Sequence, residues 1–229
     1  MGIILYRNML NQEMKTFGKF LKQIYEDCIK KDIHLKYVYS SHVQKYIDEI
    51  KQGDTIIIVA HGSEEAIFHR YDHTNSVENH QYLLKSNELD VLNDNKIIAV
   101  SCGCARKLGP ESVSQGKCKV FLGFMNSIHF DKKNGKHVSK YYENYVKTIY
   151  KGVFLEIIER AIIENWTFQK LGNVLSWELR KSVTEMSKKE LEVSGTHAYF
   201  GRGIDQAILA INDVAANIKI FGEASITVR

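Results

Sequence analysis

The sequence predicts an α/β protein in which a mostly parallel sheet lies between layers of helices. Three observations support this fold class. Short β-branched runs recur in the first half of the 229-residue chain, and helical patterns separate them. The second half carries long apolar stripes with spacings of three and four residues, which are typical of amphipathic helices. Strands that alternate with helices form βαβ units, whose right-handed crossovers make the strands parallel.

The first part of the chain alternates expected strands and helices. Residues 3–6 (IILY) predict a first strand, and residues 34–39 predict a second. Between them, residues 11–30 carry an apolar stripe that predicts one helix. Ser41 is expected to cap a further helix that ends near Lys51.

Three more strands follow, and their composition indicates burial on both faces. Residues 55–60 (TIIIVA) form a continuous β-branched run, and residues 96–100 and 119–124 are also predominantly apolar. Runs without alternating polar residues are typical of strands that are covered on both sides, as in parallel sheets.

The C-terminal part reads as helices that pack on this sheet. Residues 142–162 predict a long amphipathic helix, and Thr167 is expected to cap another. The polar, glycine-containing stretch 194–204 predicts a loop. A last helix is expected from Asp205, followed by an edge strand at 218–221.

Composition limits the class of protein. The formal net charge is +4, from 31 Lys and Arg against 27 Asp and Glu, without a basic block that would indicate nucleic-acid binding. Apolar runs fall well short of the ~20 residues that span a bilayer. The spacing of the four cysteines does not indicate a disulfide framework, so we expect a cytoplasmic protein. We expect one domain over 1–229, with an α/β core at 1–130 and a helical part at 131–229.

Two expected strands end in reactive residues. The first ends IIIVAHG, which places His61 and Gly62 just past the strand, and the second ends IIAVSCG, which places Cys102 and Gly103 there. In a parallel sheet such groups collect at one edge. An imidazole near a thiol generates the thiolate nucleophile, and glycine permits close approach of a substrate backbone. The sequence therefore predicts a Cys–His site at this edge.

The same residues carry a resemblance to a known family. A strand that ends in His61-Gly62, followed by a strand and the turn SCGCARKLG, resembles the caspase-like (clan CD) cysteine peptidases. The pattern is most similar to the bacterial CHAT-type proteases, in which the nucleophile lies in a turn of small residues that Leu-Gly often follows. The resemblance covers about residues 55–126.

The resemblance implies a fold, a reaction and a set of site residues. The fold would be the three-layer caspase-like sandwich. His61 would be the general base, Cys102 the nucleophile, and the backbone N–H groups of Gly62 and Cys102 the oxyanion hole. The enzyme would cleave a protein substrate through a thioester, with no metal or organic cofactor. A separate activating protein in a bacterial antiviral defence or regulatory system would control the enzyme. We expect the enzyme itself to contact neither nucleic acid nor membrane.

The resemblance does not extend to a known specificity. Metacaspases carry an acidic residue two positions before the nucleophile, where this chain has Val100, so a basic P1 residue is not indicated. The Gln and Arg that flank the nucleophile of caspases are also missing here, so a strict Asp preference is not indicated either.

Two other interpretations remain open. In the first, the protein keeps the caspase-like fold but Cys102 and His61 do not catalyse a reaction, so that it acts as an interaction module. Alternatively, His69 and His73 could hold a metal with Cys102 and Cys104, although a Cys-x-Cys pair alone is a poor zinc site. Cys104 is interpreted as a structural thiol. Neither a phosphate-binding loop nor a Gly-x-Ser-x-Gly elbow occurs in the sequence, which argues against a P-loop enzyme and a serine hydrolase.

Overall fold

The architecture is a mostly parallel sheet between two layers, as expected. The computed structural model describes residues 2–39, 43–71, 80–115, 117–128, 132–133, 136–137 and 140–229. Its central sheet has the order β2 (Lys36–Val38), β1 (Ile3–Arg7), β3 (Thr55–Val59), β6 (Asn95–Val100), β7 (Cys118–Phe124) and β10 (Ile218–Gly222). The strands from β2 to β7 are parallel, and β10 runs antiparallel to β7 at the edge.

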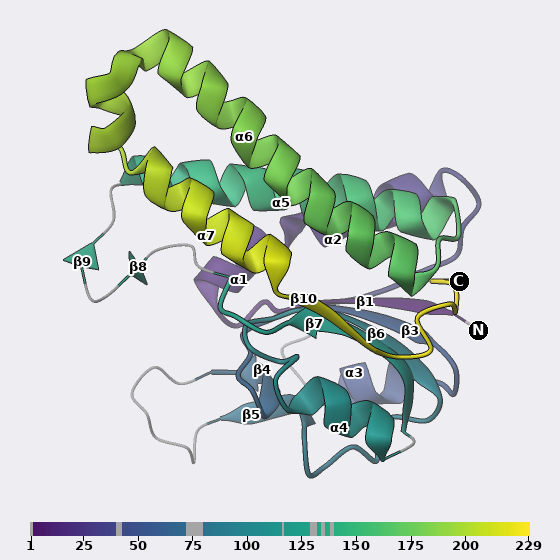
Figure 1. The fold of residues 1–229 in the computed structure, drawn as a ribbon. Coiled ribbons are helices and arrows are strands. Elements are labelled where there is room, and N and C mark those ends of the chain that lie inside the picture. The colour runs from purple at the N-terminus through teal and green to yellow at the C-terminus, as the bar shows by residue number, and fades with distance from the viewer. Residues whose placement is uncertain are drawn as a thin grey trace.

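Helices and a hairpin cover the two faces of this sheet (Figure 1). One face carries α1 (Gln12–Phe17), α2 (Lys19–Ile29), α5 (Lys140–Ile163), α6 (Phe168–Gly201) and α7 (Ile204–Ala216). The opposite face carries α3 (Val43–Glu49), α4 (Leu108–Ser114) and the hairpin of β4 (Ala66–Arg70) and β5 (Gln81–Lys85). A short antiparallel pair, β8 (Lys132–Lys133) and β9 (Lys136–His137), follows β7.

The central strands are buried on both sides because their side chains alternate between two cores. In β3, Ile57 and Val59 pack among the long helices, whereas Ile56 and Ile58 pack among α3, α4 and the hairpin. All four side chains are fully buried. Burying a side chain of this size stabilises the fold by about 1.5–3 kcal/mol. This explains the unbroken apolar run of the sequence.

The helical C-terminal part agrees with the expected stripes. The Lys170 N–H donates to Thr167 Oγ1 at 3.2 Å, so Thr167 caps α6 as predicted. Residues of α5 and α6 at helical spacing, such as Phe154 and Leu175, are buried in the core. No helix within the described ranges combines the length and the apolarity that a membrane crossing requires.

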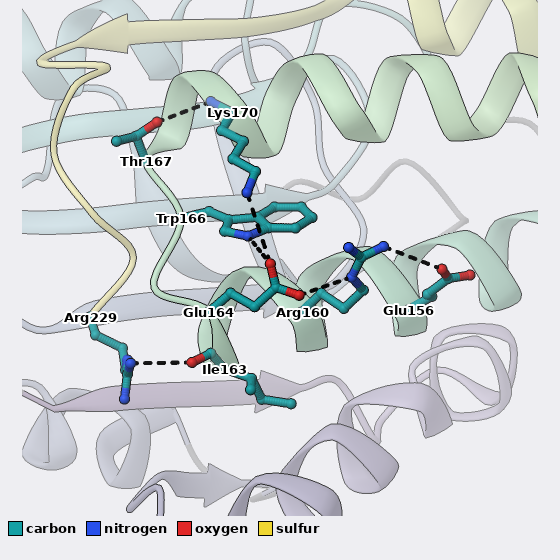
Figure 2. Close-up of polar contacts among 8 residues, drawn as sticks. All are labelled: Glu156, Arg160, Ile163, Glu164, Trp166, Thr167, Lys170 and Arg229. Atoms are coloured by element: carbon teal, nitrogen blue, oxygen red, sulfur yellow. Dashed lines mark hydrogen bonds and ion pairs between the residues drawn. The ribbon is translucent and has the colours of Figure 1, made fainter.

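An aromatic corner joins α5 to α6 (Figure 2). The Trp166 ring lies 5.1 Å from the Arg160 guanidinium and 4.1 Å from the Lys170 ammonium. Its indole N–H donates to Glu164 Oε2 at 2.6 Å. The C-terminal Arg229 donates to the carbonyl of Ile163 at 3.2 Å, which attaches the end of the chain to the same corner. The two long helices are therefore tied together at one end.

Two helix predictions differ from the structure. The helix expected over 11–30 is divided at Gly18, where α1 ends and α2 begins. A side chain is disfavoured there, because a Cβ on Gly18 would lie 3.0 Å from Arg7 Cγ. The capping role expected for Ser41 lies outside the described residues; the helix that follows it, α3, is present.

The prediction of a loop at 194–204 was wrong. The chain remains helical to Gly201, with a kink at Gly195, where φ is +70° and ψ is 171°. Glycine adopts this conformation without steric cost, so the helix changes direction instead of ending. The Arg202 guanidinium bonds Glu190 at 3.2 Å and Ser194 Oγ at 2.9 Å, which braces the kink.

Candidate active site

His61 and Cys102 occupy equivalent positions at the ends of neighbouring strands. In the β3–β6 pair, Val59 lies opposite Val100. His61 follows Val59 by two residues, and Cys102 follows Val100 by two residues. Both therefore leave the carboxyl edge of the sheet at the same level. Both also line one pocket of about 180 Å³, so the structure brings the predicted pair to a single site.

Gly62 fits tightly against the backbone that carries the thiol. A Cβ at this position would lie 2.7 Å from the Cys102 carbonyl oxygen and 2.9 Å from Ser101 Cβ. On its other side, the Ser63 N–H donates to the Ala66 carbonyl at 2.8 Å, which pairs the segment with β4. The chain after His61 is thus held between β4 and the turn of Cys102.

The turn of Cys102 is attached to the end of β7. Gly103 has a φ of +67°, a left-handed conformation that favours glycine. Its N–H donates to the Asn126 carbonyl at 3.2 Å, and the Ala105 N–H donates to the Phe124 carbonyl at 3.2 Å. These bonds fix the thiol relative to the loop that follows β7.

The Cys102 side chain is half-buried, and its surroundings favour the neutral thiol over the thiolate. Its burial raises its pKa above the ordinary value, and the carboxylate of Glu13 raises it further. The N–H groups of Ile128 and of Cys102 itself lower this pKa, but by less. Ile128 N–H donates to Sγ at 3.2 Å. Within the part of the chain that the structure describes, Ile128 rather than His61 is the hydrogen-bond partner of this thiol.

The His61 ring packs against an aromatic stack from the hairpin. The centroid of Tyr71 lies 5.4 Å from that of His61, with the rings tilted by 38°. On Tyr71, His80 stacks with a centroid distance of 5.1 Å and an angle of 19°. No local pattern in the sequence links Tyr71 to His61, so this neighbour could not be predicted. The hairpin between β4 and β5 creates this contact.

The two backbone groups predicted for an oxyanion hole lie beside each other. The hypothetical Cβ of Gly62 lies 3.1 Å from the Cys102 nitrogen, which shows how close the two segments are. Neither N–H donates a backbone hydrogen bond to another described residue. Within the described residues both groups thus remain available as donors, as an oxyanion hole requires.

The second cysteine of the turn has a different environment. Cys104 is fully buried, and its thiol contacts the Ser101 carbonyl at 3.2 Å. Burial raises its pKa to about 12. Cys28 and Cys118 are buried as well, so Cys102 is the only one of the four thiols with appreciable exposure. The structure thus separates Cys102 from its neighbour and agrees with a structural role for Cys104.

The residues considered for a metal site do not assemble in the described part of the chain. His69 is fully buried in β4, and its Nδ1 is hydrogen-bonded to the Tyr6 hydroxyl at 2.5 Å. His73 lies outside the described residues. Among those that are described, no group of three or more His, Cys, Asp or Glu side chains could hold a metal ion.

Comparison with the models of known protein families gives no match for this chain, and a search of curated proteins gives none either. A partly exposed thiol, an imidazole on the adjacent strand end, two backbone donors and a pocket are the components that acyl transfer through a thioester requires.

Proposed function

We propose that this protein is a cysteine endopeptidase of the caspase-like, CHAT type, in which Cys102 and His61 form the catalytic dyad. One observation carries the proposal. His61 and Cys102 each lie two residues beyond the paired Val59 and Val100, and both line the same pocket. The turn motif around Cys102 and the His61-Gly62 strand end, which resemble that family, support the same assignment.

The reaction follows from these components. His61 takes the thiol proton of Cys102 as sulfur attacks the carbonyl carbon of a peptide bond. The oxyanion is held by the N–H groups of Gly62 and Cys102. His61 then gives its proton to the leaving amine, which leaves a thioester on Cys102. Water, deprotonated by His61, attacks this thioester, and the carboxylate product leaves as the thiol is restored.

The environment of the thiol favours a resting state that must be activated. Burial raises the pKa of Cys102 by more than the Ile128 N–H lowers it, so the neutral thiol is favoured, and this thiol is hydrogen-bonded to Ile128 and not yet to His61. Catalytic hydrogen bonds often tighten only when the complex forms. A separate protein partner that closes the site would supply this step, in a cytoplasmic bacterial defence or regulatory system like those of the proteases that the motifs resemble. The four free cysteines are compatible with such a reducing compartment.

Cleavage of a proteome-derived peptide library tests the proposal. Wild type should generate new peptide termini with a common sequence pattern when proteins purified alongside it are present. Cys102→Ala and His61→Ala should abolish these cleavages. The matched controls are Cys104→Ser, two residues away in the same turn, and His34→Ala, which replaces an exposed histidine. Cleavage that persists in Cys102→Ala would exclude the dyad.

The raised thiol pKa also favours a second candidate, a caspase-like interaction module with a silent dyad. The two functions differ in whether the reactivity of the Cys102 thiol depends on His61. In a peptidase, His61→Ala lowers the rate at which peptide-based electrophiles label Cys102. In a silent module, that rate stays the same.

A further inference from the structure

Apolar side chains form the larger part of the pocket beside Cys102, and Glu13, Ser101 and Ser127 add polar groups to its walls. Met14 and Phe17 enter from α1, Val100 from the end of β6, and Ile128 from the loop after β7. The pocket is also lined by Cys102 and His61. A side chain that enters beside both the nucleophile and the base belongs to the residue whose carbonyl is attacked. The pocket therefore receives P1, the residue on the N-terminal side of the cleaved bond.

The size of the pocket indicates a side chain of medium volume. The pocket measures about 180 Å³. For comparison, an apolar cavity of about 150 Å³ in another protein holds a benzene molecule. A branched aliphatic, thioether or phenyl group fills such a space, whereas alanine or glycine at P1 leaves the apolar walls of Met14, Phe17 and Ile128 without a contact.

The charges around the pocket disfavour an ionised P1 side chain. Glu13 is the one carboxylate among the described lining residues, and no Lys or Arg occurs among them. Glu13 already forms an ion pair at 3.8 Å with Lys147 of α5. An acidic P1 group would meet Glu13 without a cation to pair with. A basic P1 group would have to compete with Lys147 for Glu13 while its charge is desolvated against Phe17 and Val100, which costs more than a half-buried ion pair returns.

We propose, on the basis of the peptidase function above, that this site selects a neutral apolar P1 residue of the size of leucine, methionine or phenylalanine. Val100 and Ile128 form the walls that determine specificity. Glu13 also lines the pocket, and its ion pair with Lys147 compensates its charge. The protein thus cleaves after apolar residues, in contrast to the charged or polar P1 residues that are usual in the family that its motifs resemble.

Peptidyl acyloxymethyl ketones that differ only at P1 test this specificity. The probes carry Leu, Met, Phe, Lys, Asp or Gly at P1 behind one invariant P4–P2 sequence. Intact-mass spectrometry of the full chain gives the second-order rate constant of labelling for each probe. The Leu, Met or Phe probe is expected to react at least tenfold faster than the Lys, Asp and Gly probes, in a manner that requires Cys102 and His61.

Two variants locate the selectivity in this pocket. Val100→Ala enlarges the pocket, so the rate ratio of the Phe probe to the Leu probe should rise; thermal unfolding verifies that the variant is folded. An unchanged ratio in the folded variant overturns the pocket assignment. Glu13→Gln removes the carboxylate and should keep the order of Leu over Lys.

The outcomes separate the specificity from the function. If the Lys or Asp probe reacts fastest and labelling still depends on His61, the apolar specificity is overturned and the peptidase function stands. If, with proteins purified alongside it present, no probe labels Cys102 faster than iodoacetamide does, or if His61→Ala changes none of the rates, the peptidase function is overturned and the specificity falls with it.

Discussion

Gly62 lies against the backbone of Cys102, so closely that a Cβ on Gly62 would be 2.7 Å from the Cys102 carbonyl oxygen. Real Cβ atoms essentially never approach an oxygen to this distance. The contact joins the ends of β3 and β6, and it holds His61 at a fixed position relative to the turn of the thiol. The glycine after the histidine is thus a requirement of the site geometry.

Gly62→Ala should therefore damage activity more than stability. The added methyl group must push the turn of Cys102 away, and a displacement on the order of 1 Å in an active site can lower the rate about 100-fold. The matched control is Gly152→Ala in α5, where the new methyl group meets no atom within 4 Å. This control should keep full activity and gain about 0.4–1 kcal/mol of stability, since alanine favours helix. Rates of peptide cleavage and thermal unfolding of both variants measure the difference; equal activity in the two would contradict the contact.

Alkylation of Cys102 should show the pH dependence of a half-buried thiol with a raised pKa. Only the thiolate reacts, and burial raises the pKa of Cys102, so less thiolate is present at any given pH than in a free cysteine. The rate with iodoacetamide should rise with pH through a midpoint above the ~8.5 of an unperturbed thiol. Cys28, Cys104 and Cys118 should react only after unfolding, because they are buried.

Mass spectrometry of the labelled native protein checks this result, with Cys102→Ser as the variant that should remain unlabelled. A midpoint below pH 7 would show that the resting site already holds a thiolate. In that event the requirement for an activating step would be unsupported.

Much of the fold follows from local sequence patterns. The runs at 55–60 and 96–100 predicted β3 and β6, because strands that are buried on both faces need apolar side chains at every position. The edge location of His61 and Cys102 followed from the same runs, since each residue comes directly after one. Secondary structure and the shared edge are therefore properties that the local sequence encodes.

Other parts of the site depend on contacts between distant segments. Tyr71 and Ile128 reach His61 and Cys102 through the hairpin and the loop after β7, and no spacing in the sequence links them. Phe17 belonged to an expected core stripe, but its place beside the thiol depends on how α1 lies on the sheet. The error at 194–204 has a similar origin, since Gly195 bends α6 where its composition suggested an end.

Tyr71 should act as a positioning residue for His61. An aromatic stack contributes about 0.5–1.5 kcal/mol, which corresponds to roughly a 2- to 10-fold change in rate. Tyr71→Ala should lower kcat by this factor, leave KM nearly unchanged and shift the pH profile of kcat, whereas Tyr71→Phe should restore both properties. Tyr39→Ala, which removes an exposed ring, serves as the control. An unchanged pH profile in Tyr71→Ala would limit the stack to a structural role.

The corner at Trp166 should dominate the stability of the helical layer. Trp166 is 4% exposed and lies between two cationic side chains, so Trp166→Ala should cost about 3–5 kcal/mol of unfolding free energy. The only other tryptophan, Trp177, is 59% exposed, and its replacement by alanine should change this free energy by no more than about 0.5 kcal/mol. Urea denaturation of both variants measures the two values; similar losses would contradict the importance of the corner.

The thioester on Cys102 is the most direct test of the proposed chemistry. An activated peptidyl p-nitrophenyl ester acylates a catalytic thiol without protonation of the leaving group, so intact mass after acid quench reports the acyl-enzyme. Wild type and Cys104→Ser should gain the acyl mass, neutral hydroxylamine should remove it, and His61→Ala should form it more slowly. Cys102→Ala should gain no such mass. An acyl adduct that forms equally in Cys102→Ala, or none on the wild type under conditions where iodoacetamide labels Cys102, would contradict the assignment of this protein as a Cys102–His61 peptidase.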